Sequence, residues 1–112
     1  MKKIEAIIRP EKLEQVHRAL EKLGHGGLMV TEIEGQGKQR GIVQQWRGEK
    51  YRVELLPKIK IEAIVKDSDV ELVIKTIIEG AKTGEIGDGK IFISTIDDAI
   101  RIRTGAKGDE VL

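Results

Sequence analysis

The sequence predicts an α+β domain in which two tandem strand–helix–strand units form one sheet. Three observations indicate this architecture. A strand-like segment at residues 3–9 (KIEAIIR) recurs at residues 60–66 (KIEAIVK). A helical pattern follows each copy, and a further strand-like run closes each half, at residues 28–34 and 90–96. With 112 residues, the chain has the length of one domain with one core.

The repeated segment is predicted to be a strand with two different faces. Side chains alternate along a strand, so Ile4, Ala6 and Ile8 share one face. Glu5 and Ile7 share the other face. The second copy has the same pattern, and the all-apolar face is the one expected to pack against the helices.

The first helix is predicted from apolar residues at three- and four-residue spacing. Pro10 marks its start, because proline is favoured in the first helical turn, and Gly24 marks its end. The apolar residues of this pattern are Leu13, Val16, Leu20 and Leu23.

The second helix has the same spacing in the second half of the chain. Asp67 or Ser68 is the expected N-cap, since short polar side chains accept hydrogen bonds from the first helical amides. Gly80 or Gly84 is expected near its end. Its apolar residues are Val70, Val73, Ile74, Ile77 and Ile78.

Two such units in tandem give the order βαββαβ, which is the ferredoxin-like topology. It has a four-stranded antiparallel sheet with both helices on one face. The opposite sheet face includes Ile7 and Ile64, which are too apolar to remain in contact with water. We therefore expect self-association through that face. The alternative is that a ligand or a tail covers it.

Residues 35–54 form an insertion that is longer than this topology requires. It contains Trp46 and Tyr51, two of the three aromatic residues of the chain. Residues 42–46 and 51–56 are expected to pair as a hairpin. An exposed Trp, Arg and Tyr together have the composition of an interaction hot spot. The alternative is an arm that packs on a neighbouring subunit.

The run Gly87-Asp88-Gly89-Lys90 precedes the last predicted strand. Glycines let backbone amides approach an anion and lysine supplies a positive charge, so the run is a candidate phosphate cradle. It is not a Walker P-loop, because Ile91 follows Lys90 where that motif has Ser or Thr. The alternative is an ordinary turn, since Gly-Asp-Gly before a strand is common turn chemistry.

Two arginines near the end of the chain are a second candidate anion site. Residues 100–104 alternate between apolar and polar, and a short strand there would place Arg101 and Arg103 on one face. Paired guanidinium groups match the geometry of a polyphosphate. Lys38, beside glycines in the insertion, is a further candidate. The alternative is a solvated edge strand whose charges oppose aggregation.

Composition excludes several classes of function. The chain has no cysteine, which excludes disulfides, zinc–thiolate sites and thiol catalysis. Its net charge of +1 indicates no general affinity for nucleic acid or acidic membranes. Without a membrane-length apolar run or a signal-peptide pattern, we expect a cytoplasmic protein that does not insert into membranes. His17 and His25 are expected at the surface rather than as metal ligands, and no residue pattern indicates a catalytic centre.

Four segments together resemble the PII nitrogen-regulatory signal-transduction family, and the resemblance extends from residue 1 to about residue 105. Such an ordered set at family spacing is specific, whereas each segment alone is not. The segments are residues 2–10 (KKIEAIIRP), 30–39 (VTEIEGQGKQ), 56–62 (LPKIKIE), and 83–92 (TGEIGDGKIF) with 101–105 (RIRTG).

The resemblance implies a single PII-type domain, residues 1–112, that assembles as a homotrimer with nucleotide sites between subunits. ATP and ADP would compete for these sites. The adjacent subunit would contribute Leu28, Met29, Arg101 and Arg103; family members often have threonine at the position of Met29, which bears on base recognition. The residues implied on the first wall are Ile7, Gly35, Gly37, Lys38, Gln39, Glu62, Ile64, Gly87, Asp88, Gly89 and Lys90.

The resemblance also implies a site for Mg²⁺ and 2-oxoglutarate. Gln39 would coordinate the Mg²⁺ that is bound to the ATP phosphates. The 2-oxoglutarate would chelate this metal beside Gly87, with Lys58 paired to its distal carboxylate. A dicarboxylate beside a triphosphate needs a divalent cation and a lysine to offset the repulsion.

The insertion corresponds to the T-loop of this family, about residues 37–55, and the chain ends in a tail of about residues 97–112. Trp46, Arg47 and Tyr51 are the expected partner-binding residues. Arg47 matches the loop arginine that plugs the pore of ammonium transport channels, so such a channel is the leading target. The alternative is a PII-type regulator of nitrogenase or of another nitrogen-assimilation enzyme.

The implied function is that of a non-enzymatic sensor. ATP, ADP and 2-oxoglutarate would select among T-loop conformations because they bind these conformations with different affinity. Two other classes are a slow ATPase or phosphotransferase that uses the same cleft, and a structural trimer of the related metal-tolerance type that lacks a nucleotide site.

Overall fold

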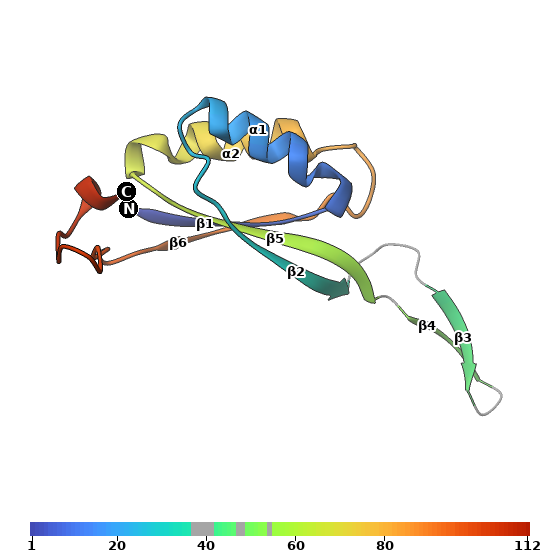
Figure 1. Cartoon of the computed structure of the whole chain (residues 1–112). Helices are drawn as coiled ribbons and strands as arrows, with labels where there is room; N and C mark the ends of the chain where they lie inside the picture. The colour runs from blue at the N-terminus through green and yellow to red at the C-terminus, as the bar shows by residue number, and fades with distance from the viewer. Residues whose placement is uncertain (37–41, 47–48, 54) are drawn as a thin grey trace.

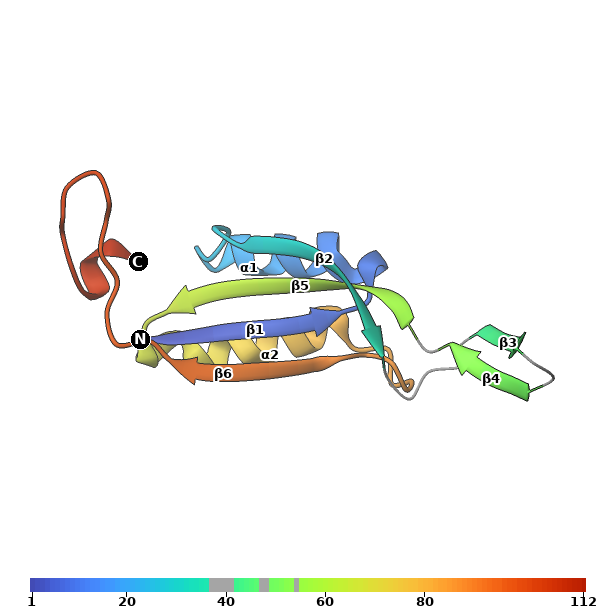
Figure 2. The same ribbon diagram turned by 90° about the horizontal axis from the view of Figure 1, so that it is seen from below.

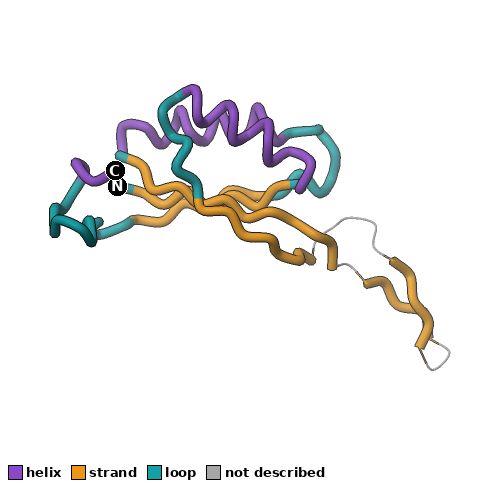
Figure 3. The backbone as a smooth tube through the Cα atoms, viewed as in Figure 1, coloured by secondary structure: helices purple, strands orange, loops and turns teal. Residues whose placement is uncertain are grey.

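The computed structural model describes residues 1–36, 42–46, 49–53 and 55–112, with side chains outside residues 35–55. Two helices and a four-stranded sheet form the body, and a two-stranded hairpin lies beyond one end of the sheet (Figure 3). The elements are β1 (Lys2–Ile8), α1 (Leu13–Lys22), β2 (Met29–Gln36), β3 (Ile42–Trp46), β4 (Glu49–Val53), β5 (Leu55–Val65), α2 (Val70–Ala81) and β6 (Lys90–Thr95), with 3₁₀ turns at Pro10–Lys12, Asp67–Asp69 and Asp109–Val111.

The main sheet has the strand order β2-β5-β1-β6, and every neighbouring pair is antiparallel (Figure 2). Its register places Ile4 of β1 between Ala63 of β5 and Ile93 of β6. Helices α1 and α2 pack together on one face of this sheet (Figure 1). The predicted ferredoxin-like fold is confirmed. Among the described residues no helix covers the other face, which we call the open face.

The core lies between the helices and the sheet, as the alternation in the repeat predicts. Ile4, Ala6 and Ile8 are each at most 2% exposed, and they face the helices. The helices supply Val16 and Leu20 from α1, both fully buried. The remaining buried apolar residues are Ile59, Ile61, Ala63, Val65, Val73, Ile77 and Ala81.

The two helices cross closely at a glycine. A Cβ added at Gly80 in α2 would lie 3.1 Å from Cγ2 of Val16 in α1. A side chain at this position would therefore require Val16 to give by a few tenths of an ångström. Gly80 was expected near the end of the helix, and α2 ends one residue later at Ala81.

The start of α2 differs from the prediction. The expected cap at Asp67 or Ser68 is wrong, because these residues form a 3₁₀ turn and the N-cap of α2 is Asp69, which makes no side-chain cap hydrogen bond. The Asp67 carboxylate instead lies 3.0 Å from the Met1 amine at the start of β1. This ion pair lowers the pKa of Asp67, chiefly through the hydrogen bond from the amine. A tertiary contact has replaced a local one.

The hairpin in the insertion is confirmed, with a change at its boundary. Strands β3 and β4 pair in antiparallel register, from Ile42 opposite Val53 to Trp46 opposite Glu49. The second arm was expected to continue to Leu56. That residue belongs instead to β5, where it pairs with Gly35 of β2.

The prediction of a short strand at residues 100–104 is wrong. The chain turns there: the Gly105 amide donates to the Arg101 carbonyl over 2.8 Å, and Gly105 has φ of 72°. Ile100 makes an isolated bridge to Lys107, and Ile102 between the two arginines is fully exposed. A strand requires a neighbouring strand along its length, and the described part of the chain supplies only this single bridge.

Candidate functional site

The open face carries rows of side chains that the register fixes. Directly opposed residues on neighbouring strands share a face, so Lys60 of β5, Ile7 of β1 and Lys90 of β6 form one row. Two residues along the strands, Glu62 and Glu5 form the centre of the next row. The open face is therefore mixed, with isoleucine beside charged residues.

Four of these charges form a network in the middle of the open face. Lys3 lies 3.4 Å from Glu62, and Lys60 lies 3.5 Å from Glu5 and 3.6 Å from Glu62. The two carboxylates are cross-strand neighbours that would repel each other, and the two lysines compensate this repulsion. The Glu62 side chain is only 19% exposed, so the network is partly shielded from water.

The loop before β6 is held in shape by the carboxylate of Asp88. Its Oδ2 accepts the backbone amides of Thr83 and Gly84, each over 2.9 Å. Its Oδ1 accepts the Thr83 hydroxyl over 2.5 Å and Arg9 Nε over 3.2 Å. These donors stabilise the charged form and hold the pKa of Asp88 far below its usual range; the Thr83 hydroxyl has the largest effect.

Two cations from neighbouring strands hold the carbonyls of the same loop. Arg9, just after β1, donates from Nη2 to the Ile86 carbonyl over 2.9 Å. Lys58 of β5 donates from Nζ to the Gly87 carbonyl over 2.8 Å. Lys58 is 7% exposed. Its pKa is lowered, chiefly by burial and next by the nearby charge of Arg9, while Glu11 and Asp88 act in the opposite direction.

The glycines of this loop are required by its backbone. Gly87 and Gly89 have φ of 104° and 102°, which L-residues with a side chain rarely adopt. A Cβ at Gly89 would lie 1.7 Å from the Ile7 carbonyl oxygen, well inside van der Waals contact. The loop therefore rests directly on the end of β1. The next residue, Lys90, is exposed and begins β6.

A hollow of about 400 Å³ lies between α2 and the edge of the sheet at β6. It reaches the same loop, since Gly89 and Lys90 contribute to its lining. Most of the lining is aliphatic and includes Ile74, Ile77, Ile78, Ile91 and Ile93. Ile78 and Ile93 are 47% and 50% exposed, so this wall is open to solvent.

Comparison with known proteins identifies the family. Residues 1–106 match the model of the family described as "Nitrogen regulatory protein P-II". The chain belongs to the P-II family. "Nitrogen regulatory protein P-II 2" of Methanothermobacter thermautotrophicus is 56% identical over all of this chain and 97% of its own length. "Nitrogen regulatory protein P-II" is 52% identical in Nostoc punctiforme and 53% in Pyropia yezoensis, each over the full length of both chains.

The chain is thus a relative of nitrogen regulatory proteins, and the resemblance inferred from its four segments is confirmed. No described helix of this P-II protein is long and apolar enough to cross a membrane. The described residues also contain no cluster of three or more His, Asp or Glu side chains of the kind that holds a metal ion.

Within one P-II chain the predicted nucleotide residues fall into two groups. Ile7 and Gly87 to Lys90 lie at the end of the sheet where the loop before β6 rests on β1. Met29 begins β2, is 51% exposed, and lies opposite Glu62 on the open face. Leu28 is partly buried against the core, and Ile64 is half-buried.

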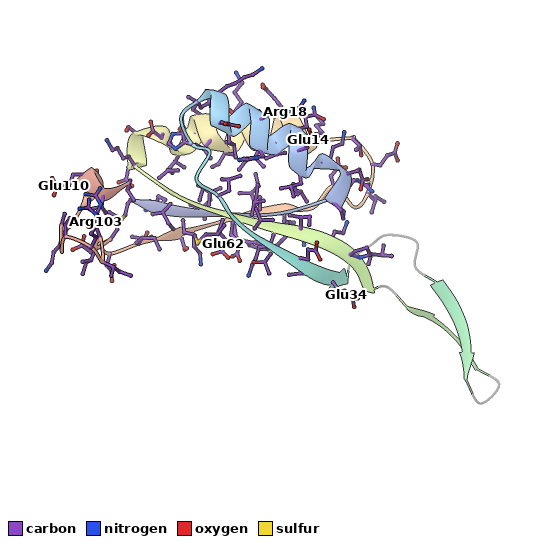
Figure 4. All side chains as sticks on the ribbon, in the orientation of Figure 1. Glu14, Arg18, Glu34, Glu62, Arg103 and Glu110 are labelled. Atoms are coloured by element: carbon purple, nitrogen blue, oxygen red, sulfur yellow. The ribbon has the colours of Figure 1, made fainter. Side chains whose placement is uncertain are left out.

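The structure does not bring Arg101 and Arg103 to that loop. Arg103 lies in the C-terminal tail, at the end of the sheet where β1 starts, whereas Glu34 lies at the opposite end (Figure 4). Both arginines are exposed, and Arg101 donates to the Glu110 carbonyl over 3.5 Å. A site that uses both the loop and these arginines therefore needs a second copy of the chain.

Several predicted residues lie outside the part of the chain that the structure describes. These are Gly37, Lys38, Gln39 and Arg47. For Gly35, Trp46 and Tyr51 the backbone is described as strand, and the side chains lie outside the description.

Sequence reasoning missed two residues that shape the site, Arg9 and Thr83. Both lie in segments that carried the family resemblance, but neither was assigned a role. Thr83 and Asp88 are five residues apart in a Gly-rich turn, and hydroxyl and carboxylate side chains in turns commonly bond nearby backbone groups. Arg9 carries no such local signal, because its partner Asp88 is 79 residues away.

Proposed function

We propose that this P-II protein is a sensor that binds ATP or ADP at the loop before β6 and responds to 2-oxoglutarate. The observation that carries the proposal is the convergence of Gly87, Gly89, Lys58 and Lys90 at one end of the open face. Positive-φ glycines allow an anion close to the backbone, and the two lysines supply positive charge.

The charge balance of this end of the sheet suits a polyphosphate. Asp88 is paired with Arg9, so its negative charge is compensated within the loop. Lys90 is exposed and lies next to the glycines. In the proposed complex Lys90 contacts the phosphates, and Gly87 and Gly89 permit their close approach.

The 2-oxoglutarate in this proposal binds next to the nucleotide. Lys58 supports this, because a buried ammonium with lowered pKa gains from a carboxylate partner. Gln39 would hold Mg²⁺, which supplies the charge that lets a dicarboxylate and a triphosphate lie side by side. The expected consequence is that Lys58→Met weakens 2-oxoglutarate binding at least tenfold. ATP binding is expected to weaken less, because Lys58 supports the loop through the Gly87 carbonyl and Lys90 remains beside the phosphates. Lys75→Met, on the exposed side of α2, is the control.

The proposed assembly is a homotrimer, in which neighbouring chains complete each nucleotide site. Three features support it: the half-buried Ile7 and Ile64 on the open face, the outer edges of β2 and β6, which pair with no strand in the described part of the chain, and the hollow beside α2. A head-to-tail contact between opposite edges of the sheet closes into a ring of three when it rotates each chain by about 120° relative to the previous one. Met29, Arg101 and Arg103 would then reach the site from a neighbour.

The proposed readout is the T-loop, with the hairpin β3–β4 as its arm and an ammonium transport channel as its leading target. Membership of a nitrogen regulatory family supports a target in nitrogen metabolism. Trp46, Arg47 and Tyr51 are the proposed contact residues. Pull-down of the channel by the full chain, but not by Arg47→Ala, is the expected result; capture of a nitrogen-assimilation enzyme instead would redirect the proposal to that target.

Titration calorimetry of the assembled protein tests the central proposal. ATP and ADP are expected to bind and to displace each other. Addition of 2-oxoglutarate with Mg²⁺ is expected to produce heat only when ATP is present. No heat with either nucleotide would refute the proposal, and rapid phosphate release from Mg-ATP would favour an ATPase.

A further inference from the structure

We propose that Thr83 and Asp88 are positioning residues for the nucleotide site: their side chains fix the loop that would hold the phosphates and do not themselves contact the ligand. The proposal rests on the proposed function, because it concerns the same loop. It replaces the expectation that Asp88 belongs to the nucleotide-binding residues themselves.

The first support is that the Asp88 carboxylate is fully engaged inside the protein. It accepts four hydrogen bonds, from the amides of Thr83 and Gly84, the Thr83 hydroxyl and Arg9 Nε. A carboxylate has about four lone-pair directions, so this set leaves none for a metal ion or a ribose hydroxyl. To bind a ligand, Asp88 would first have to release the loop.

The second support is that the Thr83 hydroxyl joins two parts of the loop. It donates to Asp88 Oδ1 over 2.5 Å and accepts the Glu85 amide over 3.1 Å. One hydroxyl therefore connects the start of the loop to the residue between Gly87 and Gly89. A hydroxyl can do both because it is donor and acceptor at once, and no apolar side chain of the same shape can replace it.

The third support is electrostatic. An unpaired carboxylate one residue from a phosphate-binding glycine would repel the ligand. Arg9 lies 3.2 Å from Asp88 and compensates that charge. Arg9 also holds the Ile86 carbonyl, and Lys58 holds the Gly87 carbonyl, so in the chain without ligand the loop is already fixed to the end of β1 and to β5.

The test replaces the hydroxyl without changing the shape of the side chain. In Thr83→Val the affinity for ADP without Mg²⁺ and for ATP with Mg²⁺ is expected to fall at least about tenfold, because the loop loses the hydroxyl bonds to Asp88 and to the Glu85 amide. Thr83→Ser keeps the hydroxyl and is expected to bind within about twofold of the unaltered protein. Thr76→Val is the matched control, since it also removes a threonine hydroxyl, which in α2 donates to the Leu72 carbonyl over 2.7 Å.

Asp88→Asn separates positioning from metal binding. A positioning role predicts equal losses of affinity with and without Mg²⁺, because the loop is disturbed in both cases. A loss confined to Mg²⁺ conditions would make Asp88 a metal ligand and overturn the proposal. Unchanged nucleotide affinity of Thr83→Val would overturn it as well.

Amide hydrogen exchange gives a readout that needs no ligand. In Thr83→Val the amides of residues 84–89 are expected to exchange faster while those of α2 keep their rates; in Thr76→Val the loop amides are expected to keep theirs. Unchanged loop exchange in Thr83→Val would refute the proposal even if no nucleotide binds. If the unaltered protein binds no nucleotide but the loop exchange responds as stated, the proposed function fails. The role of Thr83 in fixing the loop is then still supported.

Discussion

Arg9 and Asp88 are 79 residues apart in the chain, yet Arg9 Nε lies 3.2 Å from Asp88 Oδ1. The pair joins the end of β1 to the loop that begins β6. It therefore holds this loop against the end of β1. Since Asp88 also binds the backbone of Thr83 and Gly84, the same carboxylate controls both the shape and the position of this loop.

The first prediction concerns acid stability. The folded state holds the pKa of Asp88 below its usual range, so Asp88 stabilises the fold at pH values above its ordinary pKa of about 4. That stabilisation is expected to be lost as the pH falls below about 4, because the unfolded state then binds a proton at Asp88 that the folded state does not bind until a lower pH. Urea unfolding between pH 2 and 7 measures the effect.

Asp88→Asn is expected to flatten this acid dependence. Asp97→Asn is the control, because Asp97 is exposed. If the slope of stability against pH between 2 and 4 were the same in Asp88→Asn as in the unaltered protein, the assignment to Asp88 would be wrong.

The second prediction concerns the contact between Gly89 and β1. Gly89→Ala is expected to destabilise the fold by more than about 3 kcal/mol, since the new Cβ would meet the Ile7 carbonyl at 1.7 Å. Gly84→Ala is the matched control: Gly84 also has positive φ, 92°, but a Cβ there meets nothing within 4 Å. It should cost only about 1–2 kcal/mol of backbone strain.

Guanidinium unfolding of the two glycine variants gives the comparison. Equal losses in the free energy of unfolding would mean that the loop can move away from Ile7 at little cost. The close approach would then not constrain the position of the loop.

The third prediction concerns assembly. Ile93→Glu is expected to convert the proposed homotrimer to monomer, because it places a charge at the hollow between α2 and β6. Leu72→Glu is a control of equal exposure, with Leu72 at 51% and Ile93 at 50%. Light scattering after size exclusion reports the mass. A monomeric Leu72→Glu, or a trimeric Ile93→Glu, would place the contact elsewhere.

The fourth prediction concerns the arginines of the C-terminal turn. Replacing Arg101 and Arg103 together with Ala is expected to weaken ATP binding at least tenfold, since two charge-assisted contacts to phosphate would be lost. The oligomeric state should not change, because both side chains are exposed in the single chain. Lys107→Ala, in the same turn, controls for the loss of a nearby charge. Unchanged ATP affinity in the double variant would remove the arginines from the site.

Much of the fold could be predicted because its causes are local. The alternation of Ile4, Ala6 and Ile8 selects a strand and the face that it buries, and all three are buried as expected. Gly24 ends the first helix with φ of 85°. Glycine adopts this left-handed conformation by itself, without a tertiary contact to impose it. The repeat itself determines the order βαββαβ.

The errors occurred where a distant partner decides the local structure. Alternation at residues 100–104 indicated a strand, but a strand forms only beside another strand, and here the chain turns back at Gly105. Asp67 has a side chain that is typical of a helix cap, but its carboxylate instead forms an ion pair with the Met1 amine, 3.0 Å away. At Asp67 a tertiary contact outweighed the local preference. At residues 100–104 the local preference was not enough, because the described chain supplies no neighbouring strand.

The sequence by itself determined the family, the topology and the glycines and lysines of the candidate site, because these depend on residue type and spacing. Only the tertiary structure decided what Asp88 does. Its carboxylate faces into the loop because Arg9 arrives there from β1, a placement that depends on strand register rather than on neighbouring residues. The tertiary structure likewise separated Arg101 and Arg103 from the loop, since β6 carries the chain to the opposite end of the sheet (Figure 1).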